Sequence, residues 1–299
     1  MQETTDGVYC IVDLHALTVH REPGELPRAT LEAAKDLMAI GIDPDQSILF
    51  VQSHVREHTE LAWHMQCVAA VGELRRMTQF KDKSETNEFV SAGLFTYPTL
   101  QAADILLYDT DVVPVGDDQR QHVEFTRDLA TRFNHRYGTE GGEPILVVPE
   151  HRIPEAGARI MDLQYPENKM SKSADSPQGI VLLTDTEAQI SKKFKRAVTD
   201  NDGEVRFDPE TKPGVSNLLT VLAAATDGDP TALAENYTQY GPLKADAAEA
   251  LIELLRPIQQ RRAELDDETT RKILAEGADQ ARARAVPVME RVRKAVELL

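Results

Sequence analysis

Cysteine and long apolar runs are both scarce in this sequence. The 299-residue chain contains only two cysteines, Cys10 and Cys67, which cannot form a disulfide framework and lack the spacing of a zinc site. We therefore expect both to be small buried apolar residues in a reducing compartment. No stretch reaches about 18 consecutive apolar residues. The polar residues 1–7 have neither the basic nor the apolar part of a signal peptide. These absences predict a cytoplasmic protein without a membrane span.

Positive charge is also scarce. Lys and Arg number 33 against 50 Asp and Glu, so the net charge is −17. Such a chain repels nucleic acid as a whole, so we expect no DNA binding, and any RNA must meet a local basic patch. The one dense basic cluster contains Lys192, Lys193, Lys195 and Arg196. Either a solvated helix face or a nucleic-acid contact would explain this cluster.

One short stretch combines lysine with serine. Lys169, Met170, Ser171, Lys172 and Ser173 offer two ammonium groups, two hydroxyls and several backbone N–H groups. The lysine ammonium is a compact charge with rotatable donors that suits phosphate oxygens. The stretch therefore indicates a polyphosphate site, although a K-x-x-K spacing alone is more often a solvated basic turn.

The order of apolar segments predicts an α/β fold. Short continuous apolar runs are typical of strands buried on both faces, and here they alternate with helical patterns. We therefore expect a Rossmann-like doubly wound parallel sheet over residues 1–183, followed by an all-helical domain over 184–299. The predicted strands are 8–12, 48–51, 112–115, 145–148 and 180–183, and the predicted helices of the first part are 27–40, 59–71, 97–108 and 121–135.

Several polar residues stand out against this pattern. His15 follows the first strand, and ligands of open parallel sheets bind beyond the carboxyl ends of strands; a surface histidine is the alternative. Asp104 lies within an apolar helix, where a carboxylate is costly unless paired, so it either caps a neighbouring loop or accepts a hydrogen bond from a ligand. Gly116 begins a strand–turn–helix unit whose N–H groups suit polar ligands, a weak signal alone. The single tryptophan, Trp63, fits a core or a subunit interface.

Together these motifs resemble the class I aminoacyl-tRNA synthetases, and among them the bacterial tryptophanyl-tRNA synthetases. The motifs occur in the order and at the spacing of that family, and the resemblance covers essentially the whole chain. The segments that carry it are 11–18, 77–81, 97–106, 113–119, 157–161, 169–173 and 195–200.

The resemblance implies a tryptophan pocket. Asp104 would accept the indole N–H, which is a donor only, and phenylalanine or tyrosine would leave this carboxylate unpaired at a cost of about 1–3 kcal/mol. Val113, Val115 and Ile105 would shape the apolar slot. The residues that would contact the amino acid are His15, Tyr97 and Gln119.

The resemblance also implies an ATP site, with Mg²⁺ assisting. Gly116, Asp117 and Asp118 would lie at the ribose, and Ile160 would meet the adenine through its backbone. Lys169 and Lys172 would neutralise the departing pyrophosphate as the tryptophan carboxylate attacks the α-phosphorus in line. The remaining implied ATP contacts are Met170, Ser171 and Ser173. The helical domain would bind tRNA(Trp), and the family acts as a homodimer.

The chain departs from the family in two places. The family's first strand and its Pro-x-Gly phosphate-binding segment do not occur in these residues, so Met1 is either an internal methionine or the start of a short form, and we favour the first. Gln101 stands where the family often has methionine. Two further interpretations stay open: a tyrosyl enzyme, which segments 102–105 and 116–119 disfavour, and a form that binds tryptophan and tRNA without activating the amino acid.

Overall fold

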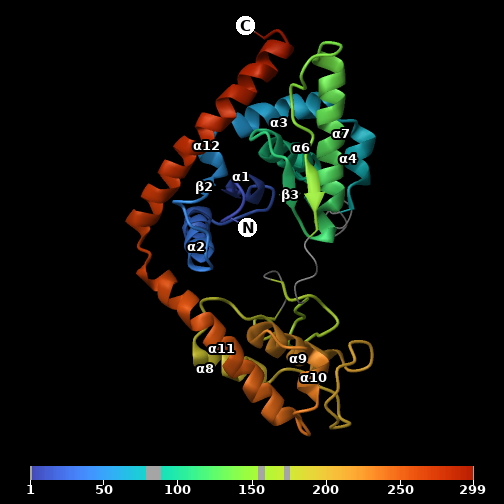
Figure 1. Cartoon of the computed structure of the whole chain (residues 1–299), viewed down its shortest axis with the longest axis vertical. Coiled ribbons are helices and arrows are strands. Elements are labelled where there is room, and N and C mark those ends of the chain that lie inside the picture. Colours follow the sequence, from blue (N-terminus) through green and yellow to red (C-terminus); the bar gives the residue numbers. More distant parts are fainter. Residues whose placement is uncertain (1, 79–88, 154–158, 172–175, 299) are drawn as a thin grey trace. The chain divides into compact units, whose positions relative to one another are not determined.

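The computed structural model describes residues 2–78, 89–153, 159–171 and 176–298 and forms two compact units (Figure 1). The first unit combines Met1–Pro154 with Leu265–Leu299, and the second is Glu155–Glu264. The predicted boundary at 183/184 therefore falls inside the second unit. The difference arises because the last helix of the chain packs on the strands of the first unit, and because the segment that contains Lys169 packs with the helices that follow it.

The first unit contains parallel strand pairs. Strand β1 (Val8–Ile11) pairs with β2 (Ile48–Val51), with Val8 opposite Ile48, and β3 (Val112–Pro114) pairs with β4 (Glu150–Arg152). Helix α2 (Glu25–Ala39) connects the first pair, and α7 (Arg120–Tyr137) connects the second. Parallel strands joined through helices confirm the α/β class expected from the sequence.

Two predicted strands, 145–148 and 180–183, are wrong. The side chain of Asn134 bonds both backbone groups of Leu146, donating to its carbonyl at 2.8 Å and accepting from its N–H at 2.9 Å. In the second segment, the N–H of Leu182 donates to Asp185 Oδ2 at 2.9 Å, and Gln259 donates to the carbonyl of Leu183 at 2.8 Å. Side chains thus satisfy backbone groups that a sheet would otherwise pair.

Helix α6 (Ala92–Leu106) forms the centre of the first unit and packs against α3 (Glu57–Val68) and α7. It begins five residues before the predicted start at Tyr97, because Ser91 caps it by accepting from the N–H of Leu94 at 3.0 Å. Pro98 therefore lies inside the helix. The predicted helix 59–71 is divided between α3 and α4 (Val71–Arg76), because Ala69 and Ala70 are extended.

Helix α12 (Asp267–Ala295) runs alongside β2 and α2 in the first unit (Figure 1). Its buried face mixes small residues with larger apolar ones, and Gly277 makes the closest approach: a Cβ there would lie 1.9 Å from the carbonyl oxygen of Leu49. The helix therefore needs glycine where it crosses the strand. Near the end of α12, the Arg293 guanidinium donates to both carboxylate oxygens of Glu60, at 2.7 and 2.5 Å.

The second unit is mainly helical. Its core contains Ile190, Phe194, Leu218 and Leu243, which come from three different helices. No helix in the described ranges is long and apolar enough to cross a membrane. The helices of this unit are α8 (Glu187–Lys195), α9 (Pro213–Thr226), α10 (Pro230–Ala234) and α11 (Tyr240–Glu264).

Two expectations about burial in the first unit are corrected. Trp63 on α3 is 64% exposed, so it is not a core residue of this chain. Cys67 is exposed and Cys10 only partly buried, so the prediction of two buried thiols is wrong. Both Trp63 and Cys67 lie on the face of α3 opposite Leu61 and Met65, which are fully buried.

Candidate active site

The carboxyl ends of β1 and β2 are joined by polar contacts. Residues directly after β1 form the short helix α1 (Asp13–Ala16), and those after β2 form the 3-10 turn η1 (Gln52–His54). The N–H of Leu14 donates to Gln52 Oε1 at 3.1 Å, and Asp13 accepts from the N–H and the hydroxyl of Ser53 at 2.9 and 2.5 Å. These contacts fix the short helix that carries His15, at the edge of the sheet where ligands are expected.

Asp104 of α6 reaches these strand ends. Its Oδ2 lies 2.8 Å from Nε2 of His15, and its Oδ1 accepts from Nε2 of Gln52 at 2.7 Å. Oδ1 also lies 2.6 Å from Nδ1 of His58 on α3, whose Nε2 lies 2.7 Å from the hydroxyl of Tyr108. The buried carboxylate that the sequence singled out is therefore surrounded by hydrogen-bond donors.

These donors keep Asp104 ionised. Burial by itself would raise the pKa of this carboxyl, but hydrogen bonds from His15 and His58 hold the pKa below its usual value of 3.8. The side chain of Asp104 is 11% exposed, and that of His15 is 18% exposed. The result is a charged acceptor in a nearly dry setting, which suits a neutral donor such as a ring N–H.

Tyr97 adds an aromatic wall beside this carboxylate. Its ring meets the ring of His15 edge-on, with 6.2 Å between centroids. Its hydroxyl lies 2.7 Å from Nε2 of His122 on α7. Burial raises the pKa of Tyr97 to about 12, so the phenol stays neutral. The structure thus brings three predicted residues, His15, Tyr97 and Asp104, into one group.

The predicted ribose-binding segment follows β3. Asp117–Gln119 forms the 3-10 turn η2, and Gln119 accepts a long hydrogen bond from Gln101 of α6 at 3.4 Å and donates to Asp118 Oδ2 at 3.0 Å. A Cβ on Gly116 would lie 2.8 Å from Asp118 Oδ1, which is the end of an exposed side chain that can move aside. Gln119 is thereby tied to the helix that carries Asp104.

The predicted apolar slot is only partly defined by contacts. Val113 on β3, Val115 just after it and Ile105 on α6 are all half-buried. The N–H of Val115 continues the strand pairing by donating to the carbonyl of Arg152 at 3.0 Å, and Ile105 accepts from the Thr110 hydroxyl at 2.7 Å. Neither contact joins the three apolar side chains to one another, so the slot remains a prediction.

The second unit holds the described part of the lysine–serine stretch. Lys169 pairs with Met161 in an antiparallel bridge, and the N–H of Met170 donates to the carbonyl of Ile160 at 3.1 Å. Asn217 of α9 holds both backbone groups of Met161 at 2.8 Å. The side chain of Lys169 is exposed, while Ile160 and Met170 pack against the core of this unit. Of the predicted ATP contacts, Lys172 and Ser173 lie outside the described residues, and Ser171 is exposed.

The basic cluster on α8 is divided between buried and exposed residues. Lys193 is buried, with Nζ 2.5 Å from Asp185 Oδ2, so it cannot face a nucleic acid. Lys192, Lys195 and Arg196 are exposed. The expectation of a wholly solvent-facing cluster is therefore wrong for Lys193. This lysine lies in the last turn of α8 and points back toward Asp185, which directly precedes the N-cap residue of the helix.

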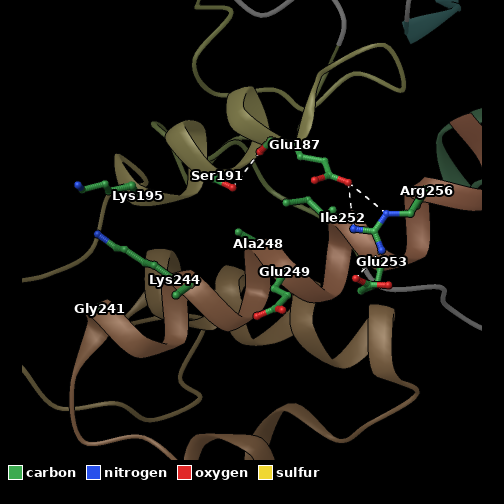
Figure 2. A pocket seen from close by; sticks show the side chains of 11 residues that line it. Glu187, Ser191, Lys195, Gly241, Lys244, Ala248, Glu249, Ile252, Glu253 and Arg256 are labelled. Atoms are coloured by element: carbon green, nitrogen blue, oxygen red, sulfur yellow. Dashed lines mark hydrogen bonds and ion pairs between the residues drawn. The ribbon is translucent and has the colours of Figure 1, made fainter.

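Lys195 lines a groove of about 750 Å³ between α8 and α11 (Figure 2). Lys244 lies at the same end of this groove, and burial lowers its pKa. At the other end, Arg256 is paired with Glu187 at 2.9 Å and Glu253 at 2.6 Å. Within the described part of the chain, Lys195 and Lys244 have no such acidic partner, so the groove has one end with uncompensated positive charge.

Sequence reasoning missed four residues of the first unit's site. Gln52 and His58 bind Asp104, Tyr108 binds His58, and His122 binds Tyr97. Some signals were available: Gln52 directly follows a buried strand, as the segment with His15 does, and Tyr108 lies four residues after Asp104, which is one helical turn. Nothing in the sequence pattern pointed to His58 or His122.

No group of three or more His, Cys, Asp or Glu residues in the described ranges could hold a metal ion. Carboxylates do occur near the predicted ribose site, but Asp117 is paired with Arg120 at 2.8 Å and Asp118 accepts from Gln119. A dedicated protein cage for a metal is therefore absent from this part of the chain. A Mg²⁺ ion that enters with ATP needs no such cage, since it binds mainly to phosphate oxygens and water.

Three comparisons with known proteins agree. A family model described as tRNA synthetases class I (W and Y) matches residues 1–256. A tryptophan–tRNA ligase of Streptomyces coelicolor is 48% identical over 100% of this chain and 89% of its own length. The crystal structure of tryptophanyl-tRNA synthetase from Mycoplasma pneumoniae matches with a TM-score of 0.90 and 35% identity, over 100% of this chain and 90% of that one.

A further structure carries ligands. The tryptophanyl-tRNA synthetase of Campylobacter jejuni, complexed with ADP and tryptophan, matches with a TM-score of 0.83 and 32% identity, over 99% of this chain and 91% of that one. The parallel strands, the helical second unit and the family match define a class I tRNA synthetase of the tryptophan and tyrosine type. Within this class, the identity over the full chain shows that the protein belongs to the tryptophan–tRNA ligases.

Proposed function

We propose that this chain activates L-tryptophan with ATP and transfers it to tRNA(Trp) for protein synthesis in the cytoplasm. The observation that carries the proposal for tryptophan is Asp104, a charged and nearly buried acceptor that lies against His15 at the carboxyl ends of β1 and β2. Indole nitrogen is a donor only, so this carboxylate matches the single polar group of the tryptophan ring. The family membership supplies the rest of the reaction.

In this proposal the amino acid lies along α6. Asp104 accepts the indole N–H, and Ile105, Val113 and Val115 form the apolar slot around the ring. His15, Tyr97 and Gln119 contact the amino acid. Tyr97 is neutral and bonded to His122, and Gln119 is tied to Gln101, so both are held before substrate arrives. Such preorganisation reduces the entropy that binding must otherwise cost.

The proposed contacts with ATP are described separately for each unit. In the first unit, Gly116, Asp117 and Asp118 contact the ribose. In the second unit, Ile160 contacts the adenine through its backbone, and the lysines neutralise the pyrophosphate. The proposed phosphate contacts are Lys169, Met170, Ser171, Lys172 and Ser173. Mg²⁺, carried by the phosphates, supplies additional positive charge at the pyrophosphate.

The chemistry is an in-line displacement. The tryptophan carboxylate oxygen attacks the α-phosphorus, a new C–O–P bond forms, and the bond from the α-phosphorus to pyrophosphate breaks. A hydroxyl of the terminal tRNA ribose then attacks the carbonyl of the adenylate, and AMP leaves. No side chain needs to form a covalent bond, so these residues act by positioning and charge.

The helical region is proposed to bind the tRNA. Within residues 184–299, exposed Lys192 and Lys195 are the first candidates for phosphate contacts. Lys244 lies across the groove from Lys195 in Figure 2, and burial lowers its pKa, so the arrival of an anion there is favourable. Lys193 is not among these contacts, because Asp185 holds it inside the unit.

A homodimer is also proposed. The exposed Trp63 is the residue most suited to an interface, since aromatic residues are enriched in such surfaces. Residues 100–107 are a second candidate for this interface, but Leu106 and Leu107 within them are fully buried in the chain and cannot contribute. A Trp63→Glu variant should therefore reduce the mass measured by light scattering toward that of one chain.

The proposed function is tested by ATP–pyrophosphate exchange with the 299-residue chain. Exchange that depends on tryptophan and not on tyrosine supports a tryptophan-activating enzyme. Exchange that depends on tyrosine would replace the proposal with the tyrosyl alternative. Tryptophan binding by calorimetry without any exchange would instead favour a form that binds the amino acid but does not activate it.

A further inference from the structure

The two oxygens of Asp104 have unequal numbers of partners. Oδ1 is contacted by Gln52 at 2.7 Å and by His58 at 2.6 Å, whereas Oδ2 is contacted by His15 at 2.8 Å. An ionised carboxylate accepts about four hydrogen bonds, two for each oxygen. Among the described residues, Oδ1 is therefore filled, and Oδ2 keeps room for one more donor.

The partners of the two oxygens also differ in burial. Gln52 and His58 are fully buried, and His58 packs between Phe50 and Tyr108, with ring centroids 5.7 and 5.6 Å away. His15, on the Oδ2 side, retains 18% side-chain exposure. The carboxylate is thus anchored from the core side and open toward the side that solvent reaches.

The chemistry of His58 determines which atoms donate and which accept in the hydrogen bonds to Oδ1. A carboxylate can only accept, so Nδ1 of His58 must carry the hydrogen that faces Asp104. In the neutral ring, Nε2 is then an acceptor, and it takes the hydroxyl hydrogen of Tyr108 at 2.7 Å. The three side chains form an ordered chain of donors that runs from Tyr108 through His58 to Asp104.

We propose that His58 is a positioning residue that determines specificity for the indole N–H, with Gln52 sharing Oδ1 and Tyr108 fixing the tautomer of His58. By occupying Oδ1, these residues orient the carboxylate so that the remaining acceptor position of Oδ2 faces the substrate. The inference rests on the proposed contact between Asp104 and tryptophan. It differs from a role in stability alone, because it concerns one hydrogen bond to the ligand.

The test compares two ligands of the same shape. L-Tryptophan has the indole N–H, whereas its benzothiophene analogue has sulfur in that place and cannot donate. The ratio of their dissociation constants, measured by calorimetry, reports the hydrogen bond to Asp104. We expect the unmodified chain to favour tryptophan by roughly tenfold or more, and His58→Leu to remove most of that preference while changing binding of the analogue little.

Two milder variants refine the result. His58→Asn places an amide N–H near the position of Nδ1 and should restore most of the preference. Tyr108→Phe removes a single oxygen and should reduce the preference only a fewfold, and it keeps the test available if His58→Leu does not fold. His64→Leu, on the same helix and also at a buried histidine, is the matched control and should leave the ratio unchanged.

The outcomes separate the two proposals. If His58→Leu and Tyr108→Phe weaken the binding of both ligands equally, or affect neither, the ratio of the dissociation constants stays the same and the positioning role is overturned. If the unmodified chain itself shows no preference for tryptophan over the analogue, the proposed contact between Asp104 and the indole fails, and the inference fails with it. A preference that is abolished by Asp104→Asn but retained in His58→Leu contradicts the inference alone.

Discussion

Nε2 of His15 lies 2.8 Å from Oδ2 of Asp104, although 89 residues separate them in the chain. One residue follows the first strand, and the other lies on the central helix of the unit. The contact is one of those that hold the pKa of Asp104 below its usual value despite burial. It therefore links the loop after β1 to the charge on which the proposed recognition of tryptophan depends.

The first prediction concerns this contact. In His15→Ala the carboxylate of Asp104 loses a hydrogen-bond donor, so its pKa should rise. On acidification, tryptophan binding should therefore be lost at a higher pH than in the unmodified chain. The sign follows because binding requires the ionised form, which is lost as pH falls through the pKa. Calorimetric titrations of both chains that start above pH 3.8, the usual pKa of the group, and continue below it measure the shift. If the pH at which tryptophan binding is lost is the same in His15→Ala as in the unmodified chain, or lower, the role of His15 is contradicted.

The second prediction separates the lysines of α8. Lys193→Ala removes one partner of a buried ion pair and should destabilise the second unit by about 3–5 kcal/mol, because the charge of Asp185 is left without its partner. Lys192→Ala and Lys195→Ala change exposed residues and should leave stability within about 0.5 kcal/mol. Urea denaturation measures both effects. Equal stability of Lys193→Ala and Lys192→Ala would show that the buried pair is unimportant.

The third prediction concerns RNA binding by the groove of Figure 2. The double variant Lys195→Ala with Lys244→Ala should weaken tRNA binding and reduce the dependence of log K on log salt by about 1 for each phosphate group that the variant no longer neutralises. Tryptophan-dependent exchange should be unaffected. Lys272→Ala, at an exposed lysine of α12, serves as the control. An unchanged affinity and salt slope in the double variant would remove the groove from the tRNA site.

The fourth prediction tests the approach of α12 to β2. Gly277→Ala places a methyl group 1.9 Å from the Leu49 carbonyl oxygen, so the helix must shift, and we expect a loss of about 1–3 kcal/mol in the free energy of unfolding. Gly241→Ala on α11 is the matched control, since a Cβ there meets nothing within 4 Å. Thermal unfolding of both variants decides the matter. A Gly277→Ala variant as stable as the control would mean that α12 does not pack this closely.

The ion pair between Glu60 and Arg293 gives the fifth prediction. The hydrogen bond from Arg293 holds the pKa of Glu60 below its usual 4.5, so the stabilisation is complete above pH 4.5 and is lost as pH falls through the lowered pKa. Both side chains are more than a third exposed, so Glu60→Gln should cost less than about 1 kcal/mol at pH 7. The difference from the unmodified chain should shrink in acid. A gap that grows as pH falls would reverse the sign and contradict the assignment.

The predictions from the sequence were most accurate where the apolar pattern fits only one kind of structural element. The runs at 48–51 and 112–115 became parallel strands, and the buried carboxylate of Asp104 was found because charge is costly inside an apolar helix. The stretch 145–148 has the same apolar character as these strands. It is not a strand because Asn134, which lies 12 residues earlier, takes over the backbone of Leu146. Such a contact depends on tertiary structure and leaves no periodic signal.

The same limit applies to the site. The pattern located Asp104 and His15, but the donors on Oδ1 come from η1 and α3, whose spacing from α6 is fixed by packing and not by local sequence. The charge run on α8 predicted basic character correctly, but it predicted exposure wrongly for Lys193, whose direction depends on Asp185. Composition can locate charged residues, whereas their partners have to be found in the folded chain.

The direct test of tryptophan recognition is exchange of pyrophosphate into ATP, measured with tryptophan and with tyrosine, for the unmodified chain beside Asp104→Asn. We expect exchange with tryptophan alone, and in Asp104→Asn a rise in the KM for tryptophan equivalent to about 1–3 kcal/mol, since an uncharged amide is a weaker acceptor. An Asp104→Asn variant with an unchanged KM for tryptophan, or an unmodified chain that uses tyrosine equally well, would contradict recognition of the indole by Asp104.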